Sequence, residues 1–131
     1  MVKRILFEFI EGLIRNIAGP IGQKIRFYYY KKRLGSCGKN VRIDVGVVFQ
    51  SPKDIFLGSN IWIDKYVLLM AGKPNFKRKS KIKKNTNFSF NIGEIHISDK
   101  VHIAPFVVLQ GHGGISILGK SAIASGAKIY S

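Results

Sequence analysis

The sequence predicts an all-β solenoid preceded by a helical segment. Branched or bulky apolar residues recur every six positions from residue 37 onward, and each set of three recurs after 20 residues, or after 40 in one case. A period of six nested in a longer period indicates a β-solenoid, in which every repeat packs on its neighbours. Residues 3–18 show instead the apolar spacing of three to four residues that is typical of an amphipathic helix. The twelve repeat positions are Cys37, Ile43, Phe49, Leu57, Ile63, Leu69, Ile97, Ile103, Leu109, Ile117, Ile123 and Ile129.

The composition of the hexads explains how such a chain turns its corners. In a short strand alternate side chains point to opposite faces, so the first residue of each hexad fills the interior and stacks on its equivalent in the next coil. The fifth position holds Val, Ile, Ala or Ser, which fit near a corner of a narrow prism. Small or turn-forming residues at positions two to four let the backbone bend. The only cysteine, Cys37, is a repeat position and is expected to be a core side chain.

Residues 1–34 form a separate N-terminal helical unit in this interpretation. Its apolar stripe consists of Leu6, Phe9, Leu13 and Ile17, and Ile10 and Ile14 widen it. Gly19 and Pro20 end the first helix, and Gly35 closes a second stretch that is aromatic and basic. No uncharged run reaches the ~20 residues that span a bilayer, and Glu8 interrupts the apolar region that a signal peptide needs. Two compatible roles stay open, a cap on the first coil and an interfacial contact with a membrane.

The net charge of +15 is concentrated in two segments. Residues 1–34 carry eight Lys or Arg and two Glu, and residues 73–84 carry seven Lys or Arg and no acid, whereas the rest of the chain is nearly neutral. A nucleic-acid-binding domain more often spreads basic and aromatic residues over its folded face, so nucleic acid is not expected as a partner. Two basic segments beside a neutral solenoid favour anionic lipid, a phosphorylated ligand or solvation alone.

Four stretches of the chain resemble the hexapeptide-repeat acyltransferase family. They are residues 57–64 (LGSNIWID), 101–105 (VHIAP), 111–114 (GHGG) and 123–131 (IASGAKIYS). The resemblance covers residues 35–131 and implies a left-handed parallel β-helix, here with an N-terminal helical segment. It is closest to the subgroup that O-acetylates sugars in surface-polysaccharide and lipopolysaccharide synthesis. It therefore implies acetyl-CoA as co-substrate, direct transfer without a metal, and a homotrimer with sites between the prisms.

The hexad pattern is broken at residues 109–114 (LQGHGG), where glycines flank His112 and let the backbone bulge. The candidate substrate-binding residues are Gln110, Gly111, His112, Gly113 and Tyr130. In the resembled family a corner histidine is the general base that takes a proton from the acceptor, and imidazole suits this role near neutral pH. His112 is the candidate base within residues 1–131, although the resemblance places the family's base in a segment that would follow Ser131. No residue is assigned to binding the co-substrate.

The other two histidines receive different interpretations. His102 occupies the sixth position of a regular hexad and is expected to point outward, where a role at a subunit interface stays open. His96 lies one residue before a repeat position and is interpreted as structural or solvated. The spacings of six and ten residues between the three histidines differ from the zinc site of the solenoid carbonic anhydrases, so no metal is predicted.

A second break in the repeat spans about residues 70–94, where 40 residues separate coils that 20 would connect. The extruded loop includes the basic residues 73–84 and is interpreted either as a lid or contact for anionic phosphates, or as a solvated loop. Near the C-terminus, Ile129 begins a side of the prism that residues 130 and 131 do not complete. Members of the resembled family usually continue for several coils, so a truncated chain is expected, and its activity stays open.

The leading functional hypothesis is an acetyl-CoA-dependent O-acetyltransferase that acts on a sugar hydroxyl of a surface polysaccharide, a lipopolysaccharide or their lipid-linked precursor. It is expected in the cytoplasm or at the inner face of the cell membrane, with an anionic membrane surface as a further partner. Two alternatives stay open. One is an inactive solenoid with a structural or membrane-associated role. The other is a nucleotide-sugar N-acyltransferase, which uses the same fold and is disfavoured because no added nucleotide-binding domain is evident.

Overall fold

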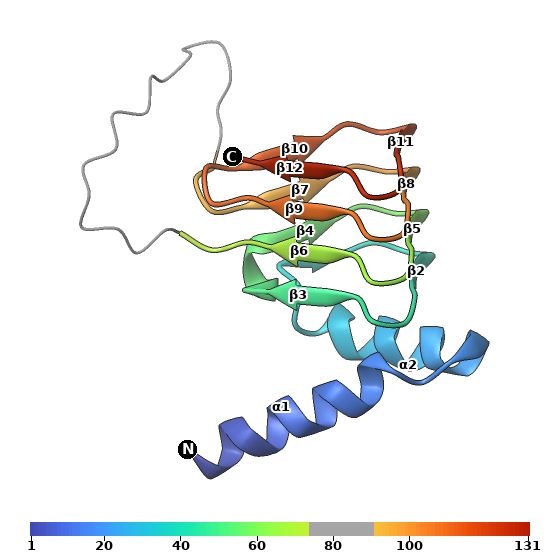
Figure 1. Ribbon diagram of the computed structural model, residues 1–131, viewed down its shortest axis with the longest axis vertical. Coiled ribbons are helices and arrows are strands. Elements are labelled where there is room, and N and C mark those ends of the chain that lie inside the picture. Colours follow the sequence, from blue (N-terminus) through green and yellow to red (C-terminus); the bar gives the residue numbers. More distant parts are fainter. Residues whose placement is uncertain (74–90) are drawn as a thin grey trace.

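The computed structural model describes residues 1–73 and 91–131, which form two helices followed by a stack of coils (Figure 1). The helices are α1 (Val2–Arg15) and α2 (Gly19–Lys31). The strands of the first two coils are β1 (Ser36–Cys37), β2 (Val41–Ile43), β3 (Val48–Gln50), β4 (Ile55–Leu57), β5 (Ile61–Ile63) and β6 (Leu68–Met70), with a short 3-10 helix η1 (Pro52–Asp54) before β4. Those of the next two coils are β7 (Ile95–Ile97), β8 (Val101–Ile103), β9 (Val108–Gln110), β10 (Ile115–Ile117), β11 (Ser121–Ile123) and β12 (Lys128–Tyr130).

The described strands form three parallel sheets, and each coil contributes one strand to each sheet. The sheet orders are β1-β4-β7-β10, β2-β5-β8-β11 and β3-β6-β9-β12. Strands that are neighbours in a sheet therefore come from successive coils, and Figure 1 shows them in columns above one another. This arrangement is a parallel β-helix with an N-terminal helical segment, which confirms the predicted fold class.

The register confirms the stacking of the predicted repeat positions. In the first sheet Cys37 pairs with Leu57, Leu57 with Ile97, and Ile97 with Ile117. The other two sheets follow the same rule, for example with Ile63 beside Ile103. The inward residues of the middle coils are buried, and full burial of one isoleucine contributes about 1.5–3 kcal/mol.

The isoleucines that precede the first-sheet repeat positions by two also face the interior, as the alternation requires. Ile55, Ile95 and Ile115 are buried and pair with one another across β4, β7 and β10. Cys37 is half-buried at the edge of this sheet, and burial raises the pKa of its thiol. Because a thiolate is the reactive form of cysteine, the raised pKa fits the core role expected for this side chain rather than a nucleophilic one.

The corners of the prism use backbone conformations that few residues adopt easily. At the corner between the first and second sheets, one residue per coil has a positive φ: Asn40, Asn60, Lys100 and Lys120. Asparagine tolerates this region better than most residues, and the Asn40 amide donates a hydrogen bond of 2.9 Å to Asn60 Oδ1 in the next coil. At the next corner Tyr66 and Phe106 have positive φ and stack their rings 5.6 Å apart.

Helix α2 covers the end of the stack, whereas α1 does not. Gly22, Arg26 and Tyr30 are spaced four residues apart on one side of α2 and are buried. The Arg26 guanidinium reaches the first coil, where its Nε donates to the Ile43 carbonyl at 2.8 Å. Helix α1 has no buried residue and projects away from the coils in Figure 1. The capping role that was left open for residues 1–34 therefore belongs to α2.

We expect Tyr30→Phe to lower the free energy of unfolding by about 1 kcal/mol at pH 7, because it removes one hydrogen bond of 2.9 Å from the Tyr30 hydroxyl to Glu11 Oε1. Burial raises the pKa of Tyr30 above its ordinary value, and Glu11 adds to the effect. The unfolded chain ionises this phenol at about pH 10 while the folded chain does not, so the native protein loses stability as pH rises above that value. The difference between the two proteins should therefore shrink above pH 10, measured by urea unfolding at several pH values.

The exposed Tyr28 on the same helix supplies the matched control for this experiment. Tyr28→Phe should leave the free energy of unfolding within about 0.5 kcal/mol of the unaltered protein. If Tyr30→Phe and the unaltered protein lose stability in parallel above pH 10, the buried hydroxyl does not contribute in the way described.

Candidate functional site

The predicted substrate-binding residues meet at one corner of the prism, where the chain passes from the third sheet back to the first. Gln110 is the last residue of β9, and Gly111 to Gly113 form the turn that follows. Tyr130 is the Cα partner of Gln110 across β12 and β9. The next residue, Ser131, donates its backbone N–H to the Gln110 carbonyl at 3.0 Å and accepts the Gly113 N–H on Oγ at 3.1 Å.

The His112 ring is held by a backbone carbonyl of the preceding coil. His112 Nδ1 lies 2.9 Å from the Gly72 carbonyl oxygen. Because a carbonyl oxygen can only accept, Nδ1 must carry the hydrogen of this bond. In the neutral ring the lone pair is then on Nε2, the nitrogen that this bond leaves unused. The arrangement fixes both the tautomer and the direction of the imidazole, which is half-buried.

Glycine makes this approach of the two coils feasible at two positions. Gly72 has φ of +111°, which L side chains rarely adopt, and its backbone N–H donates to the Gly93 carbonyl at 2.7 Å. At Gly111 a Cβ atom would lie 2.5 Å from the Ile95 side chain, so a larger residue would push the turn away from the core. The two glycines thus position the carbonyl and the turn that bring Gly72 and His112 together.

The Gly72 carbonyl was not among the residues predicted from the sequence, although the repeat contains a signal for it. His112 and Gly72 are separated by 40 residues, the same offset that pairs Met70 with Gln110 across β6 and β9. Extending that register by two positions places Gly72 beside His112. The contact lies beyond the ends of β6 and β9, where the strand pattern no longer marks which residues are neighbours.

A second pair, Glu94 and His96, flanks the same corner. His96 Nε2 lies 2.7 Å from Glu94 Oε2, and this hydrogen bond holds the pKa of Glu94 below its usual range. The Glu94 carbonyl accepts the backbone N–H of Ile115, which follows the Gly111–Gly114 turn. The His96 ring stacks on Phe56 with centroids 4.5 Å apart. The interpretation of His96 as structural or solvated overlooked Glu94, whose side chain lies on the same face because it is two residues away.

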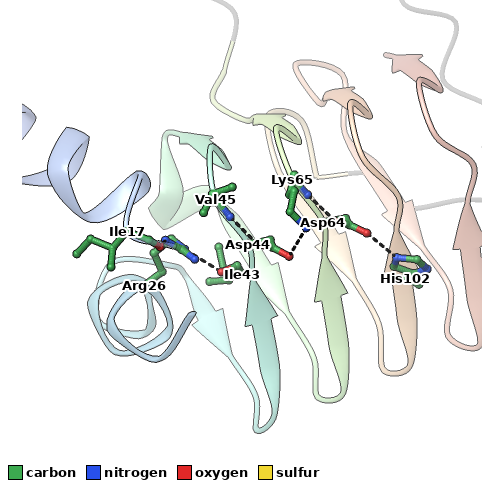
Figure 2. A network of polar contacts seen from close by, with 8 residues as sticks. All are labelled: Ile17, Arg26, Ile43, Asp44, Val45, Asp64, Lys65 and His102. Carbon is green, nitrogen blue, oxygen red and sulfur yellow. Dashed lines mark hydrogen bonds and ion pairs between the residues drawn. The ribbon is translucent and has the colours of Figure 1, made fainter. Parts of the chain in front are cut away.

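His102 lies on a different side of the prism, in the polar network that Figure 2 shows. Its Nε2 lies 3.4 Å from Asp64 Oδ2, and its ring stacks on Trp62 with centroids 4.4 Å apart. The buried carboxylates Asp44 and Asp64 each accept a backbone N–H from the following residue, and Lys65 Nζ lies between them at 3.4 and 3.8 Å. These contacts bind successive coils together. His102 points outward, as expected.

No metal cluster accompanies His112 in the part of the chain that the structure describes. Within residues 1–73 and 91–131, no group of three His, Cys, Asp or Glu side chains is placed to hold a metal ion. A shallow surface hollow of about 440 Å³ lies at the corner between the first and second sheets, lined by Ser98, Asp99, Lys100, Gly119 and Lys120. Among the described residues at this corner, His112 is half-buried and Tyr130 is exposed.

The basic segment 73–84, with its expected role as a lid or phosphate contact, lies outside the described residues except for Lys73. The described chain leaves the third sheet at Met70 and re-enters the first at Ile95, next to the His112 corner. Its interpretation stays a prediction.

Comparisons with protein families, with curated proteins and with solved structures found no match to this chain. The geometry of the corner and the resemblance of the hexads therefore carry the functional argument on their own.

Proposed function

We propose that this chain is an acetyl-CoA-dependent O-acetyltransferase of the hexapeptide-repeat acyltransferase type, acting on a sugar hydroxyl in surface-polysaccharide or lipopolysaccharide synthesis. The observation that carries the proposal is the hydrogen bond of 2.9 Å between His112 Nδ1 and the Gly72 carbonyl. It presents Nε2 as a proton acceptor at a glycine-rich corner of a parallel β-helix. The parallel β-helix itself supports the fold that the resemblance implies and says nothing of substrate.

In the proposed reaction His112 Nε2 takes the proton of the acceptor hydroxyl while the hydroxyl oxygen attacks the thioester carbonyl carbon of acetyl-CoA. The C–S bond then breaks, and the thiolate of CoA leaves with the proton that the imidazole returns. The products are the acetylated sugar and free CoA. The Gly72 carbonyl assists because it accepts the Nδ1 hydrogen more strongly when the ring is positively charged. Gln110 and Tyr130, side by side on adjacent strands, are proposed to contact the acceptor sugar.

The active form is proposed to be a homotrimer, in keeping with the half-exposed position of His112 among the described residues. Acyl transfer benefits from a site that excludes water, because electrostatic interactions are stronger there. A neighbouring prism beside the corner would supply a second wall next to residues 110–113. We place the reaction in the cytoplasm, where acetyl-CoA is available, or at the inner face of the membrane.

The proposal can be tested by measuring the release of free CoA thiol from acetyl-CoA. The candidate acceptors are a panel of sugars, lipid-linked glycans and amino-bearing nucleotide sugars. We expect release that depends on a hydroxyl acceptor, together with an acetylated product identified by mass spectrometry. Acetylation of amino sugars alone would replace the proposal with an N-acyltransferase. If calorimetry detects no binding of acyl-CoA to the chain, the proposed acetyltransferase activity is wrong and the chain is a solenoid without it.

A further inference from the structure

The apolar stripe of α1 is exposed along its whole length. Leu6, Phe9 and Leu13 are 56, 65 and 58% exposed, and no residue of the helix is buried. Val2, Ile5 and Ile10 of α1, and Ile17 just after the helix, extend the stripe and are exposed as well. Single exposed apolar residues are normal on a protein surface, but a continuous row of this length marks an interaction site.

The orientation of α1 is the reverse of what a covering helix would adopt. Its contacts with the rest of the molecule come from the side that carries Glu11: Glu11 accepts the Tyr30 hydroxyl at 2.9 Å, and the Ile14 carbonyl accepts Arg26 Nη1 at 3.1 Å. The Arg33 guanidinium also lies 5.9 Å from the centre of the Phe7 ring. Successive residues of an α-helix are about 100° apart, so Phe9 and Leu13, two positions before and after Glu11, point to the opposite side. The apolar stripe therefore faces away from the β-helix.

The side of α2 that is turned away from the β-helix is exposed as well. Gly22, Arg26 and Tyr30 occupy the inward side of the helix. The exposed residues are Ile21, Lys24, Ile25, Tyr28, Lys31 and Lys32, which combine apolar, aromatic and basic side chains and include no acid. An aromatic ring with a polar tip and lysines beside apolar residues are typical of helices that lie in the interface of a lipid bilayer.

The charges around the stripe select an anionic partner. Arg4 pairs with Glu8 at 3.0 Å and Arg15 with Glu11 at 3.5 Å, so the two acids of the helical segment are both neutralised within α1. Lys3 and the three exposed lysines of the α2 segment then leave this face positive. Anionic headgroups attract such residues, whereas the same face of a second copy would repel them.

We propose that α1 and the outward face of α2 form an interfacial anchor that lies flat on an anionic lipid bilayer. Among the described residues, no helix has the length and the apolar character to cross a membrane. Anchoring therefore uses the apolar stripe at the depth of the headgroups and lysines at the surface. The proposal does not depend on the acetyl transfer proposed above.

Sedimentation with vesicles tests the anchor directly. The full chain should bind vesicles of phosphatidylcholine with phosphatidylglycerol, bind pure phosphatidylcholine much more weakly, and lose affinity as salt is raised. Replacing Lys24 and Lys32 by glutamine should weaken binding to the anionic vesicles on the order of 25-fold. The matched control replaces Lys100 and Lys120, which lie in a corner of the solenoid, and should leave binding unchanged.

Aspartate substitutions separate the apolar contribution from the electrostatic one. Leu6→Asp and Leu13→Asp should each abolish binding to the anionic vesicles, while Leu118→Asp should not, although Leu118 is 75% exposed. None of the three side chains is buried, so circular dichroism should show an unchanged fold. In a complementary experiment, Phe9→Trp should be quenched by lipids with brominated chains, and Leu118→Trp should not.

Three results would overturn the proposal. They are a chain that does not sediment with anionic vesicles at low salt, binding that persists in Leu6→Asp and Leu13→Asp, and a fall in the oligomeric mass of these variants in light scattering. The last result would assign the apolar stripe to a second copy of the chain instead of a membrane.

Discussion

Replacing His112 by alanine is expected to lower kcat for acetyl transfer by about 10²- to 10⁴-fold, because a positioned general base contributes a factor of this size. The substitution removes Nε2, the nitrogen that the Gly72 hydrogen bond leaves unused. The KM for acetyl-CoA should change little, since no observation places the imidazole against the co-substrate. Initial rates of CoA release at saturating substrate, with the acceptor found in the screen, provide the measurement.

Two further variants distinguish the loss of a catalytic base from a general disturbance of the structure. His112→Gln keeps a side-chain N–H that can reach the Gly72 carbonyl but has no group that titrates near neutral pH, so its activity should fall as far as that of the alanine variant. His102→Ala removes the imidazole of the network on another side of the prism and should retain at least about a third of the activity. If His112→Ala keeps activity within about threefold of the unaltered protein, His112 is not the base.

Replacing Arg26 by alanine is expected to lower the free energy of unfolding by about 3–5 kcal/mol. The guanidinium is fully buried and donates to the Ile43, Ile17 and Ile14 carbonyls at 2.8, 2.6 and 3.1 Å. Figure 2 shows it between the helical link and the first coil. Its removal leaves several buried carbonyl oxygens without donors and opens a cavity under α2. The melting temperature should fall on the order of 10 °C or more.

Arg26→Lys should recover little of this stability. A lysine ammonium group cannot reach the three carbonyl oxygens, which lie on two sides of the planar guanidinium. Lys24→Ala, an exposed position on the same helix, is the matched control and should stay within about 0.5 kcal/mol of the unaltered protein. A loss below about 1 kcal/mol in Arg26→Ala would mean that water or a rearranged link satisfies the carbonyls as well as the guanidinium does.

The β-helix could be predicted from the sequence because the spacing of its apolar side chains determines the register of its strands. Cys37 pairs with Leu57 and Ile63 with Ile103 because inward positions repeat with the coil. The orientation of α1 could not be predicted in this way. Periodicity shows that an apolar stripe exists, but which side of the helix meets α2 depends on tertiary contacts such as Glu11 with Tyr30.

The sequence predicted which residues gather around His112 but not the contacts that they make, and their role as a site stays a prediction. The glycines around His112 marked the corner, and Tyr130 was placed there by the same repeat that pairs it with Gln110. The tautomer of His112 depends on one carbonyl, that of Gly72, whose approach requires a backbone conformation that the spacing does not reveal. Glu94 was missed for a related reason, since its contact with His96 depends on the rotamers of both side chains.

The regular spacing of the coils fixes the height of each residue along the stack. Parallel strands in a sheet are about 4.8 Å apart, and the turn that carries His112 belongs to the third coil, two steps from the coil beside α2. If the proposed anchor rests on a bilayer with the coils stacked perpendicular to it, and a helix about 10 Å across lies beneath the first coil, the imidazole would be on the order of 20 Å above the lipid surface. An acceptor sugar would have to be held at that height by the groups that join it to its lipid. Inserting one 20-residue coil before β7 would raise the site by about 5 Å and select a longer linkage.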